Sequence, residues 1–270
     1  MSDAPRIELL RDLDRDSGRV LLVDGVEQSY VDLVDPTHLE FEYMQHLALV
    51  ADAVLPPPKA LSAVHLGGGA LTMPRWLAAT RPDSRQVVVE FSPEVVDATA
   101  ELAPVVGCRV VLGDAVEVAS GLPARSADLV IWDLYDGPRA VTAALTMASL
   151  RAMRRLLRPR GSVLLLNVSD VVPFDVVRPV LAGLLACCDD VALLAEPTTL
   201  RGRRSGNCVL AGVRGADLPV PALTRAAAAA PVRARVVAGE ALAALVGSAV
   251  PATPEHPLPL PDATLGRGFL

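Results

Sequence analysis

The stretch that decides the fold is Val64-His65-Leu66-Gly67-Gly68-Gly69-Ala70, followed by Val87-Val88-Val89-Glu90. An apolar run ends in three glycines, a helical stretch follows, and a second apolar run ends in a carboxylate. Glycines let a ligand approach the backbone because no Cβ stands in the way. An acid at the end of the next strand can accept hydrogen bonds from two ribose hydroxyls. Glu90 lies 21 residues beyond Gly69, close to the offset of about 20 residues expected in a first β-α-β unit that binds a nucleotide.

The alternation continues along the chain, which argues against the simpler interpretation of a helix-capping turn and a surface glutamate. Short apolar runs such as 127–132 and 162–166 are typical of strands that are covered on both faces. We expect strands at 62–66, 86–90, 108–112, 127–132, 161–167, 190–195 and 207–213, and helices near 71–80, 93–103, 140–157 and 173–185. This order predicts an α/β fold, a Rossmann-like open sheet with helices on both faces and ligands beyond the C-terminal strand ends.

The flanking segments extend this core at both ends. Residues 6–34 predict short strands joined by an Asp24-Gly25 hairpin turn, and a helix is expected over 36–54, before three prolines stop it. After residue 214 the chain is rich in Pro and Ala, with short helices expected at 226–230 and 239–246. The expected parts are an N-terminal β-hairpin domain (1–35), a connecting helix with a Pro linker (36–58), a Rossmann-like cofactor-binding domain (59–214) and a C-terminal extension (215–270).

Composition limits the class of protein. The chain has 270 residues, a net charge of −6 and a pI near 5.3, which argues against nucleic acid as the main partner because phosphate binding needs a basic face. No secretory signal is visible and no run approaches the roughly 20 apolar residues of a membrane helix, so we expect a cytoplasmic protein without a membrane partner. Four cysteines without C-x-x-C spacing and four scattered histidines predict reduced thiols and no metal site.

Successive expected strands end in glycine or a carboxylate. After the three glycines and Glu90 come Gly113-Asp114 and then Asp133. Asp114 can accept a hydrogen bond from the exocyclic amine of adenine or cap the helix that follows it, and the two roles are compatible. Asp133 directly follows a buried run, where a carboxylate carries a desolvation cost. We therefore interpret Asp133 as a functional residue.

A second acid, Asp136, stands three residues after Asp133. Two carboxylates on one turn can converge on a cation or act as a general base, although Asp136-Gly137-Pro138 is also an ordinary turn sequence. Further acids precede the first strand of the sheet at Asp32, Asp35, Glu40 and Glu42. The two groups would together form an acidic mouth suited to an amine. The alternative is a solvated helix start, where acids favour the helix dipole.

In combination, these motifs resemble the spermidine synthase family, a branch of the fold shared by S-adenosylmethionine-dependent methyltransferases. The resemblance spans about residues 19–213. It rests on the order and spacing of Leu22-Val23-Asp24-Gly25-Val26-Glu27-Gln28, Leu66-Gly67-Gly68-Gly69, Val89-Glu90, Gly113-Asp114, Asp133-Leu134-Tyr135-Asp136-Gly137-Pro138 and Leu156-Leu157-Arg158-Pro159-Arg160-Gly161.

The resemblance implies a nucleoside-sulfonium cofactor, S-adenosylmethionine or its decarboxylated form. The residues implied at the cofactor are Gln28 near the nucleoside, Gly67, Gly68 and Gly69 in the loop, Glu90 at the ribose, and Asp114 with Ala115 at the adenine. Asp133 is implied as the base that deprotonates the attacking amine, and Asp136, Glu42 and Tyr135 as residues on the substrate side. The family resemblance also suggests a homo-oligomer built partly through the N-terminal strands.

Two departures from the family bear on the reaction. The family's glycine loop continues Gly-Gly-Gly-Asp-Gly, whereas this chain has Ala70-Leu71 after its three glycines. In the family that aspartate pairs with the ammonium of the decarboxylated cofactor, so its loss removes a charge that would repel the carboxylate of intact S-adenosylmethionine. The family's Tyr-His-Glu lid motif is also eroded. If Glu42 is matched to its glutamate and His46 to a later histidine, Glu40 and Phe41 stand where Tyr and His are expected.

The sequence therefore predicts a transferase in which an amine or another nucleophile attacks a carbon on the sulfonium, and it favours methyl transfer from S-adenosylmethionine. Aminopropyl transfer to a polyamine from decarboxylated S-adenosylmethionine is the close alternative. A catalytically degenerate protein that binds a nucleoside or acts as a scaffold is the third. The expected partner is a small molecule, an amine.

Overall fold

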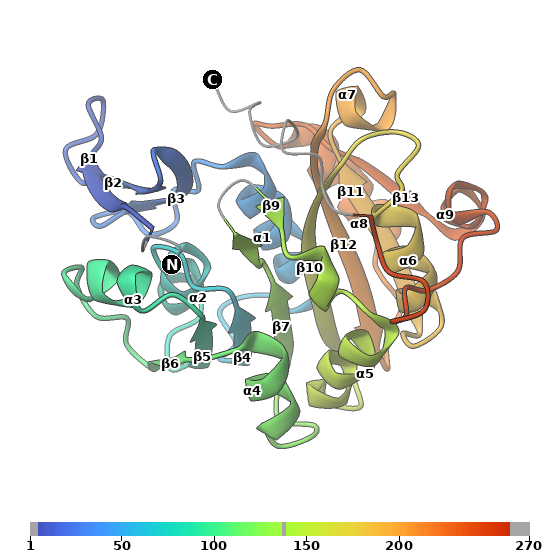
Figure 1. Cartoon of the computed structure of the whole chain (residues 1–270), viewed down its shortest axis with the longest axis horizontal. Helices are drawn as coiled ribbons and strands as arrows, with labels where there is room; N and C mark the ends of the chain where they lie inside the picture. Colours follow the sequence, from blue (N-terminus) through green and yellow to red (C-terminus); the bar gives the residue numbers. More distant parts are fainter. Residues whose placement is uncertain (1–4, 137–138, 260–270) are drawn as a thin grey trace.

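Figure 1 shows the computed structural model, which describes residues 5–136 and 139–259. Its centre is an eight-stranded sheet in the order β13-β11-β12-β10-β7-β4-β5-β6, beside a three-stranded sheet β1-β2-β3 and a short β8-β9 ribbon. The strands are β1 (Ile7–Arg11), β2 (Gly18–Val23), β3 (Val26–Asp32), β4 (Ser62–Leu66), β5 (Arg85–Glu90), β6 (Cys108–Leu112), β7 (Leu129–Trp132), β8 (Tyr135–Asp136), β9 (Arg139–Ala140), β10 (Ser162–Asp170), β11 (Asp190–Ala195), β12 (Gly206–Arg214) and β13 (Arg235–Ala238). The helices are α1 (Glu42–Val54), α2 (Thr72–Thr80), α3 (Pro93–Ala100), α4 (Ala115–Gly121), α5 (Met147–Leu156), α6 (Val177–Leu185), α7 (Pro197–Leu200), α8 (Val220–Ala229) and α9 (Gly239–Val246), with a 3₁₀ turn η1 (Thr142–Ala144).

The strands β6, β5, β4, β7 and β10 run parallel. The chain winds outward from β4 to β6 and then returns to β7 on the other side of β4. Loops that leave β4 and β7 therefore turn in opposite directions, and such a switch point opens a crevice at the carboxyl ends of the strands. β12 runs antiparallel to both β10 and β11. The parallel strands therefore carry the crevice, and β12 brings its amino end to the same edge.

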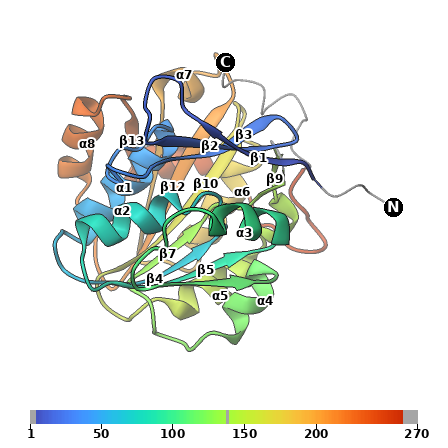
Figure 2. The ribbon, with the colours of Figure 1, turned by 90° about the vertical axis from the view of Figure 1, so that its left-hand side faces the viewer.

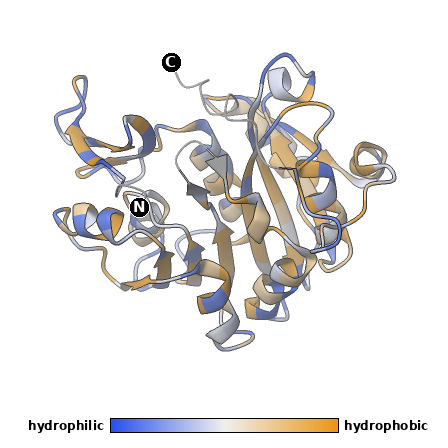
Figure 3. Ribbon diagram, in the orientation of Figure 1, coloured by the Kyte–Doolittle hydropathy of each residue, from blue (hydrophilic) through white to orange (hydrophobic). Residues whose placement is uncertain are grey.

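Helices cover both faces of this sheet (Figures 1 and 2). On one face α4, α5, α6 and α9 bury strand residues such as Leu164 and Leu166, and on the other α1, α2 and α8 bury Val163 and Leu165. The apolar run over 162–166 is thus a strand with both faces covered, as its composition predicted. Figure 3 shows the same apolar character along the central strands.

The N-terminal sheet forms a smaller layer against α2 and α3 (Figure 2). Asp24 and Gly25 form the predicted hairpin turn, both with positive φ, of 51° and 77°. The underside of this sheet packs on the glycine loop and α3 through a cluster of Leu21, Val31, Ala70, Val95 and Leu102. This packing fixes the small sheet above the carboxyl ends of β4 and β5.

Three helices begin later than the sequence pattern predicted. α1 begins at Glu42 instead of near residue 36, because Asp32 and Asp35 accept hydrogen bonds from following backbone N–H groups and hold 33–37 in turns. α5 begins after the capping hydroxyl of Thr146, and the residues before it form β9 and η1. α6 begins at Val177, where the Asp170 carboxylate accepts the first amides. Local capping overrides apolar periodicity in each case.

The chain after residue 214 adds to the same sheet. α8 packs against α1, and β13 pairs antiparallel with β11 at the sheet edge. The sequence pattern did not predict β13, whereas the helix expected at 239–246 is present as α9. Among the helices of the described residues, none combines the length and apolar character needed to cross a membrane.

Candidate active site

A cavity of about 860 Å³ lies at the carboxyl ends of β4, β5 and β7, between them and the N-terminal sheet. Its lining includes these residues proposed from the sequence: Gln28, Gly67, Gly68, Gly69, Glu90, Asp114, Ala115, Asp133 and Tyr135. Glu42 contacts a residue of the lining, as described below. The side chain of Asp136 lies outside the part of the chain that the structure describes.

The glycine loop and Glu90 hold each other in place. Glu90 Oε2 accepts hydrogen bonds from the amides of Gly68 at 2.9 Å and Gly69 at 3.4 Å, while Oε1 accepts from the amides of Phe91 and Ser92 at 2.9 and 3.0 Å. Gly67 has φ of +103°, and a Cβ at this position would overlap the carbonyl oxygen of Asp133. Only glycine fits there, because the end of β7 comes too close and φ is strained for other residues.

Asp114 caps a helix, which is one of the two roles that its position allowed in the sequence, and it also lines the cavity. Its Oδ1 accepts the amides of Val116 at 2.9 Å and Glu117 at 2.8 Å, at the start of α4. Asp114 and Ala115 reach the cavity from the end of β6, and Gln28 reaches it from β3. The cap uses one carboxylate oxygen, which leaves the other for a ligand.

Asp133 directly follows β7, and two donors hold its carboxylate. Nδ2 of Asn167 on β10 donates to Oδ1 at 3.0 Å, and the hydroxyl of Tyr43 on α1 donates to the same carboxylate. Burial raises the pKa of Asp133 to about 6, although both hydrogen bonds act to lower it. A carboxylate with a pKa near neutrality can take up and release a proton at working pH.

Two buried acceptors of the lining have no hydrogen-bond partner within residues 5–136 and 139–259: Oδ1 of Asn167 and Nδ1 of His65. Asn167 is oriented by its donation to Asp133, and His65 by its contact of 2.8 Å from Nε2 to Gln86 Oε1. Burial lowers the pKa of His65 to about 4, so its imidazole is neutral. Buried acceptors are seldom left unpaired, and these two fit a ligand that brings N–H or O–H donors.

A chain of side chains continues from the cavity to α1. The Tyr135 hydroxyl donates to Asn207 Oδ1 at 3.4 Å, and Asn207 Nδ2 donates to Glu42 Oε1 at 2.9 Å. Tyr135 and Asn207 line the cavity, so Glu42 acts on it through Asn207. Of the four acids expected before the first sheet strand, Asp32 pairs instead with Arg15, and Glu40 with His38.

The cavity wall is acidic. Its carboxylates are Asp24, Glu27, Glu90, Asp114 and Asp133, and none of the described residues of the lining is Lys or Arg. A cleft that is lined by charges of one sign raises the local concentration of ligands of the opposite charge. The cavity therefore suits a cationic ligand.

Ala70 lies behind an apolar part of the cavity wall. It is fully buried and packs in one cluster with Leu21 and Val95, which line the cavity. Residue 70 therefore supplies no acid to the wall, and Glu90 is the carboxylate that contacts the glycine loop.

Sequence reasoning missed four polar residues of the site, Tyr43, His65, Asn167 and Asn207. Tyr43 lies within the helix expected over 36–54, where it is buried with its hydroxyl on Asp133. Asn167 and Asn207 lie in strands that read as apolar runs. A polar amide within a strand that is covered on both faces was the available signal, since buried amides need partners.

Comparisons with known proteins reveal relatives at the level of structure. No family model matches the chain, and no curated protein matches it. A probable spermidine synthase from Corynebacterium glutamicum is 28% identical with a TM-score of 0.83, over 93% of each chain. Spermidine synthase from Thermotoga maritima is 18% identical with a TM-score of 0.59, over 84% of this chain and 75% of its own. Human methyltransferase-like protein 13 in complex with SAH is 20% identical with a TM-score of 0.54, over 79% of this chain and 96% of its own. The chain thus has the spermidine synthase-like α/β fold that the sequence predicted.

Proposed function

We propose that this protein is a transferase that moves a carbon group from a nucleoside-sulfonium cofactor to an amine. The observation that carries the proposal is the Asp133 carboxylate, whose pKa burial raises to about 6, in the same cavity as the glycine loop and Glu90. Two structural neighbours support it by what they hold: a spermidine synthase with the transition-state analogue AdoDATO, and the methyltransferase-like protein with SAH.

The residues of the cavity fit such a cofactor. Glu90, already fixed by four backbone amides, would accept the two ribose hydroxyls. Asp114 and Ala115 would contact the base, and Gln28 would lie near the nucleoside from the N-terminal sheet. The cofactor supplies a carbon that is open to attack and a sulfonium that leaves readily. Its positive charge suits the acidic wall.

The other end of the cavity fits an amine. Asp133 would accept a proton from the attacking nitrogen, and the unpartnered Oδ1 of Asn167 would accept a second N–H. Tyr43 keeps the Asp133 carboxylate oriented, so that the protein contributes mainly position and a base. Tyr135, Glu42 and Asp136 would lie toward the rest of the substrate.

The group transferred depends on how the cofactor's amino-acid end is held. Ala70 is buried behind the wall, so residue 70 adds no carboxylate that would repel the carboxylate of the cofactor. We therefore favour methyl transfer from intact S-adenosylmethionine. Aminopropyl transfer from the decarboxylated form is the second candidate, because its additional net positive charge suits a wall whose described residues include five carboxylates and neither Lys nor Arg.

Calorimetric titration with S-adenosylmethionine and with its decarboxylated form tests the cofactor. Glu90→Ala should weaken binding of the preferred form at least tenfold, since a bond to a charged group contributes about 1.5–3 kcal/mol. Glu101→Ala, which removes an exposed acid after α3, is the matched control and should leave binding unchanged. Binding of neither cofactor would refute the proposal, and equal affinity in Glu90→Ala would refute the ribose assignment.

Mass spectrometry then identifies the product. The protein is incubated with the cofactor that binds and a panel of diamines and polyamines, and the products are examined for a gain of one methyl or one aminopropyl group. Asp133→Asn should retain cofactor binding and lose turnover. Turnover that survives in Asp133→Asn would remove Asp133 as the base while leaving the cofactor assignment intact.

A further inference from the structure

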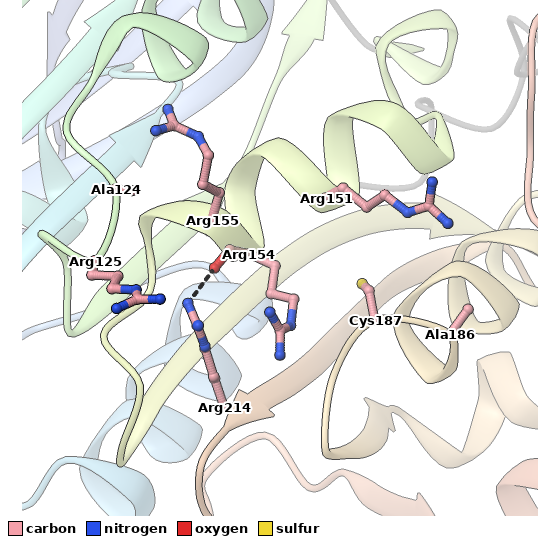
Figure 4. Close-up of a pocket in the computed structure, with 8 residues that line it drawn as sticks. All are labelled: Ala124, Arg125, Arg151, Arg154, Arg155, Ala186, Cys187 and Arg214. Atoms are coloured by element: carbon pink, nitrogen blue, oxygen red, sulfur yellow. Dashed lines mark hydrogen bonds between the residues drawn. The ribbon is translucent and has the colours of Figure 1, made fainter.

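A second cavity, of about 500 Å³, lies at the other end of the sheet from the active site. It opens where β12 ends at Arg214, opposite Ser162 at the start of β10, and its lining includes five arginines: Arg125, Arg151, Arg154, Arg155 and Arg214. They come from the loop before β7, from α5 and from the end of β12 (Figure 4). This concentration of positive charge stands out in a chain whose net charge is −6.

Three of these guanidinium groups converge. Figure 4 shows Arg125, Arg154 and Arg214 directed toward one another, while Arg151 and Arg155 point away. Burial and then the charges of Arg154 and Arg125 lower the pKa of Arg214, and the nearby Asp189 acts in the opposite direction. The three like charges therefore repel one another at close range.

Structural roles account for only part of the cluster. Arg155 Nη2 donates to the carbonyls of Ala119, Ser120 and Leu122 at the end of α4, at 3.2, 2.9 and 2.8 Å. Arg214 Nη1 donates to the carbonyl of Leu157 at 2.7 Å. Carbonyl acceptors satisfy donors but leave the charge uncompensated.

The remaining arginines lack such partners. Across the described part of the chain, no ion pair within 4.0 Å involves any of the five. Nε of Arg154 is buried and has no hydrogen-bond partner there. Buried donors and clustered positive charge both call for an anion.

We propose that this cavity binds a small multivalent anion of the phosphate class. Guanidinium groups match phosphate oxygens through two parallel hydrogen bonds, and Arg125, Arg154 and Arg214 converge from three elements on one space. The cavity is much larger than a single phosphate, so the occupant carries several phosphates or a phosphate on an organic group. Inorganic polyphosphate and a nucleoside triphosphate share this chemistry.

Calorimetry with tripolyphosphate, ATP and adenosine tests the proposal and separates the sources. We expect tripolyphosphate to bind, with affinity that falls as salt rises. Tighter binding of ATP than of tripolyphosphate would indicate a nucleotide, and equal binding an inorganic ligand. The double variant Arg125→Gln with Arg154→Gln should bind at least tenfold more weakly. Arg160→Gln, which removes an exposed arginine outside the lining, should bind as the original chain does.

Alkylation of Cys187 tests anion binding on the original protein, so this test remains available if the double variant fails to fold. Its thiol lies in the same cavity, so a bound anion should slow the alkylation of this thiol by iodoacetamide. Peptide mass spectrometry measures the rate. Cys108 on β6 lies outside this cavity and should react at an unchanged rate. Tripolyphosphate that does not bind, or that binds without protecting Cys187, would overturn the proposal. Equal loss of affinity in Arg160→Gln would do the same.

Discussion

Asp133→Asn should remove turnover and at the same time stabilise the protein at neutral pH. Burial raises the pKa of Asp133 from 3.8 to about 6, so the folded state disfavours the ionised carboxylate. A difference of roughly 2 pKa units corresponds to about 3 kcal/mol at 1.36 kcal/mol per unit. Above pH 6 the ionised carboxylate lowers the free energy of unfolding by this amount, whereas a neutral amide at the same position does not lower it.

The sign of the pH dependence follows from the raised pKa. The folded protein binds a proton at Asp133 more tightly than the unfolded chain, so stability of the original protein rises as pH falls from about 6 to 3.8. The variant lacks this rise. An amide also offers one oxygen to the two donors Asn167 and Tyr43, which costs about 1 kcal/mol. The variant should therefore be more stable by about 2 kcal/mol near pH 7.5, and the difference should fall to about zero near pH 4.5.

Urea unfolding of both proteins at half-unit intervals over this pH range measures the difference. Subtracting the two curves removes the contribution of every other titrating group. Asp97→Asn, which makes the same chemical change at an exposed position of α3, should alter stability by less than about 0.5 kcal/mol. An Asp133→Asn protein that is less stable at pH 7.5, or a difference that does not vary with pH, would refute the reasoning.

Three further predictions concern the same cavity. Tyr43→Phe removes a hydrogen bond that lowers the pKa of Asp133, so carbon-13 NMR of the Asp carboxyls should show that pKa rise by about 1–2 units. Gly67→Ala places a Cβ against the Asp133 carbonyl at φ of +103° and should lower the unfolding free energy by about 2 kcal/mol or more. Gly121→Ala, at a position with open space around it, should not lower the unfolding free energy. Chemical denaturation of both variants measures the difference. Ala70→Asp should cost about 3 kcal/mol or more in the same assay, because it buries a carboxylate without a partner.

Much of the sheet could be read from the sequence because its central strands are covered on both faces. The parallel strands β4, β5, β6, β7 and β10 are rich in apolar residues and are bounded by glycine, proline or acids, which leaves little ambiguity even for the mostly exposed edge strand β6. Helix starts were less accurate because they depend on single capping contacts, such as Asp170 with the amides of Val176 and Val177. The short strand β13 was missed because its pairing with β11 is a long-range event that its four residues do not signal.

The residues of the candidate site also differ in how far the sequence could predict them. Glu90, Asp114 and Asp133 line the cavity and could be selected from the sequence because each follows an apolar run, where a polar side chain is conspicuous. Tyr43 was hidden because it fits the buried face of α1, whereas Asn167 departs from the apolar pattern of β10 and its amide was overlooked. Their roles depend on the spatial approach of β10 and α1 to the end of β7, which no local pattern encodes.

Under the proposed function, the packing around Ala70 would make cofactor selectivity depend on both the glycine loop and the N-terminal sheet. An acid at this position would need a polar environment, yet Leu21 and Val31 of the N-terminal sheet and Val95 and Leu102 from the region of α3 surround it. A charge placed there alone would be buried unpaired, and its pKa would rise until it was neutral. Restoring an acid that pairs with an ammonium would therefore require polar changes in β2 or β3 as well. The apolar wall is in this sense a property of two sheets in contact, and a substitution at residue 70 alone should change stability more than the choice of cofactor.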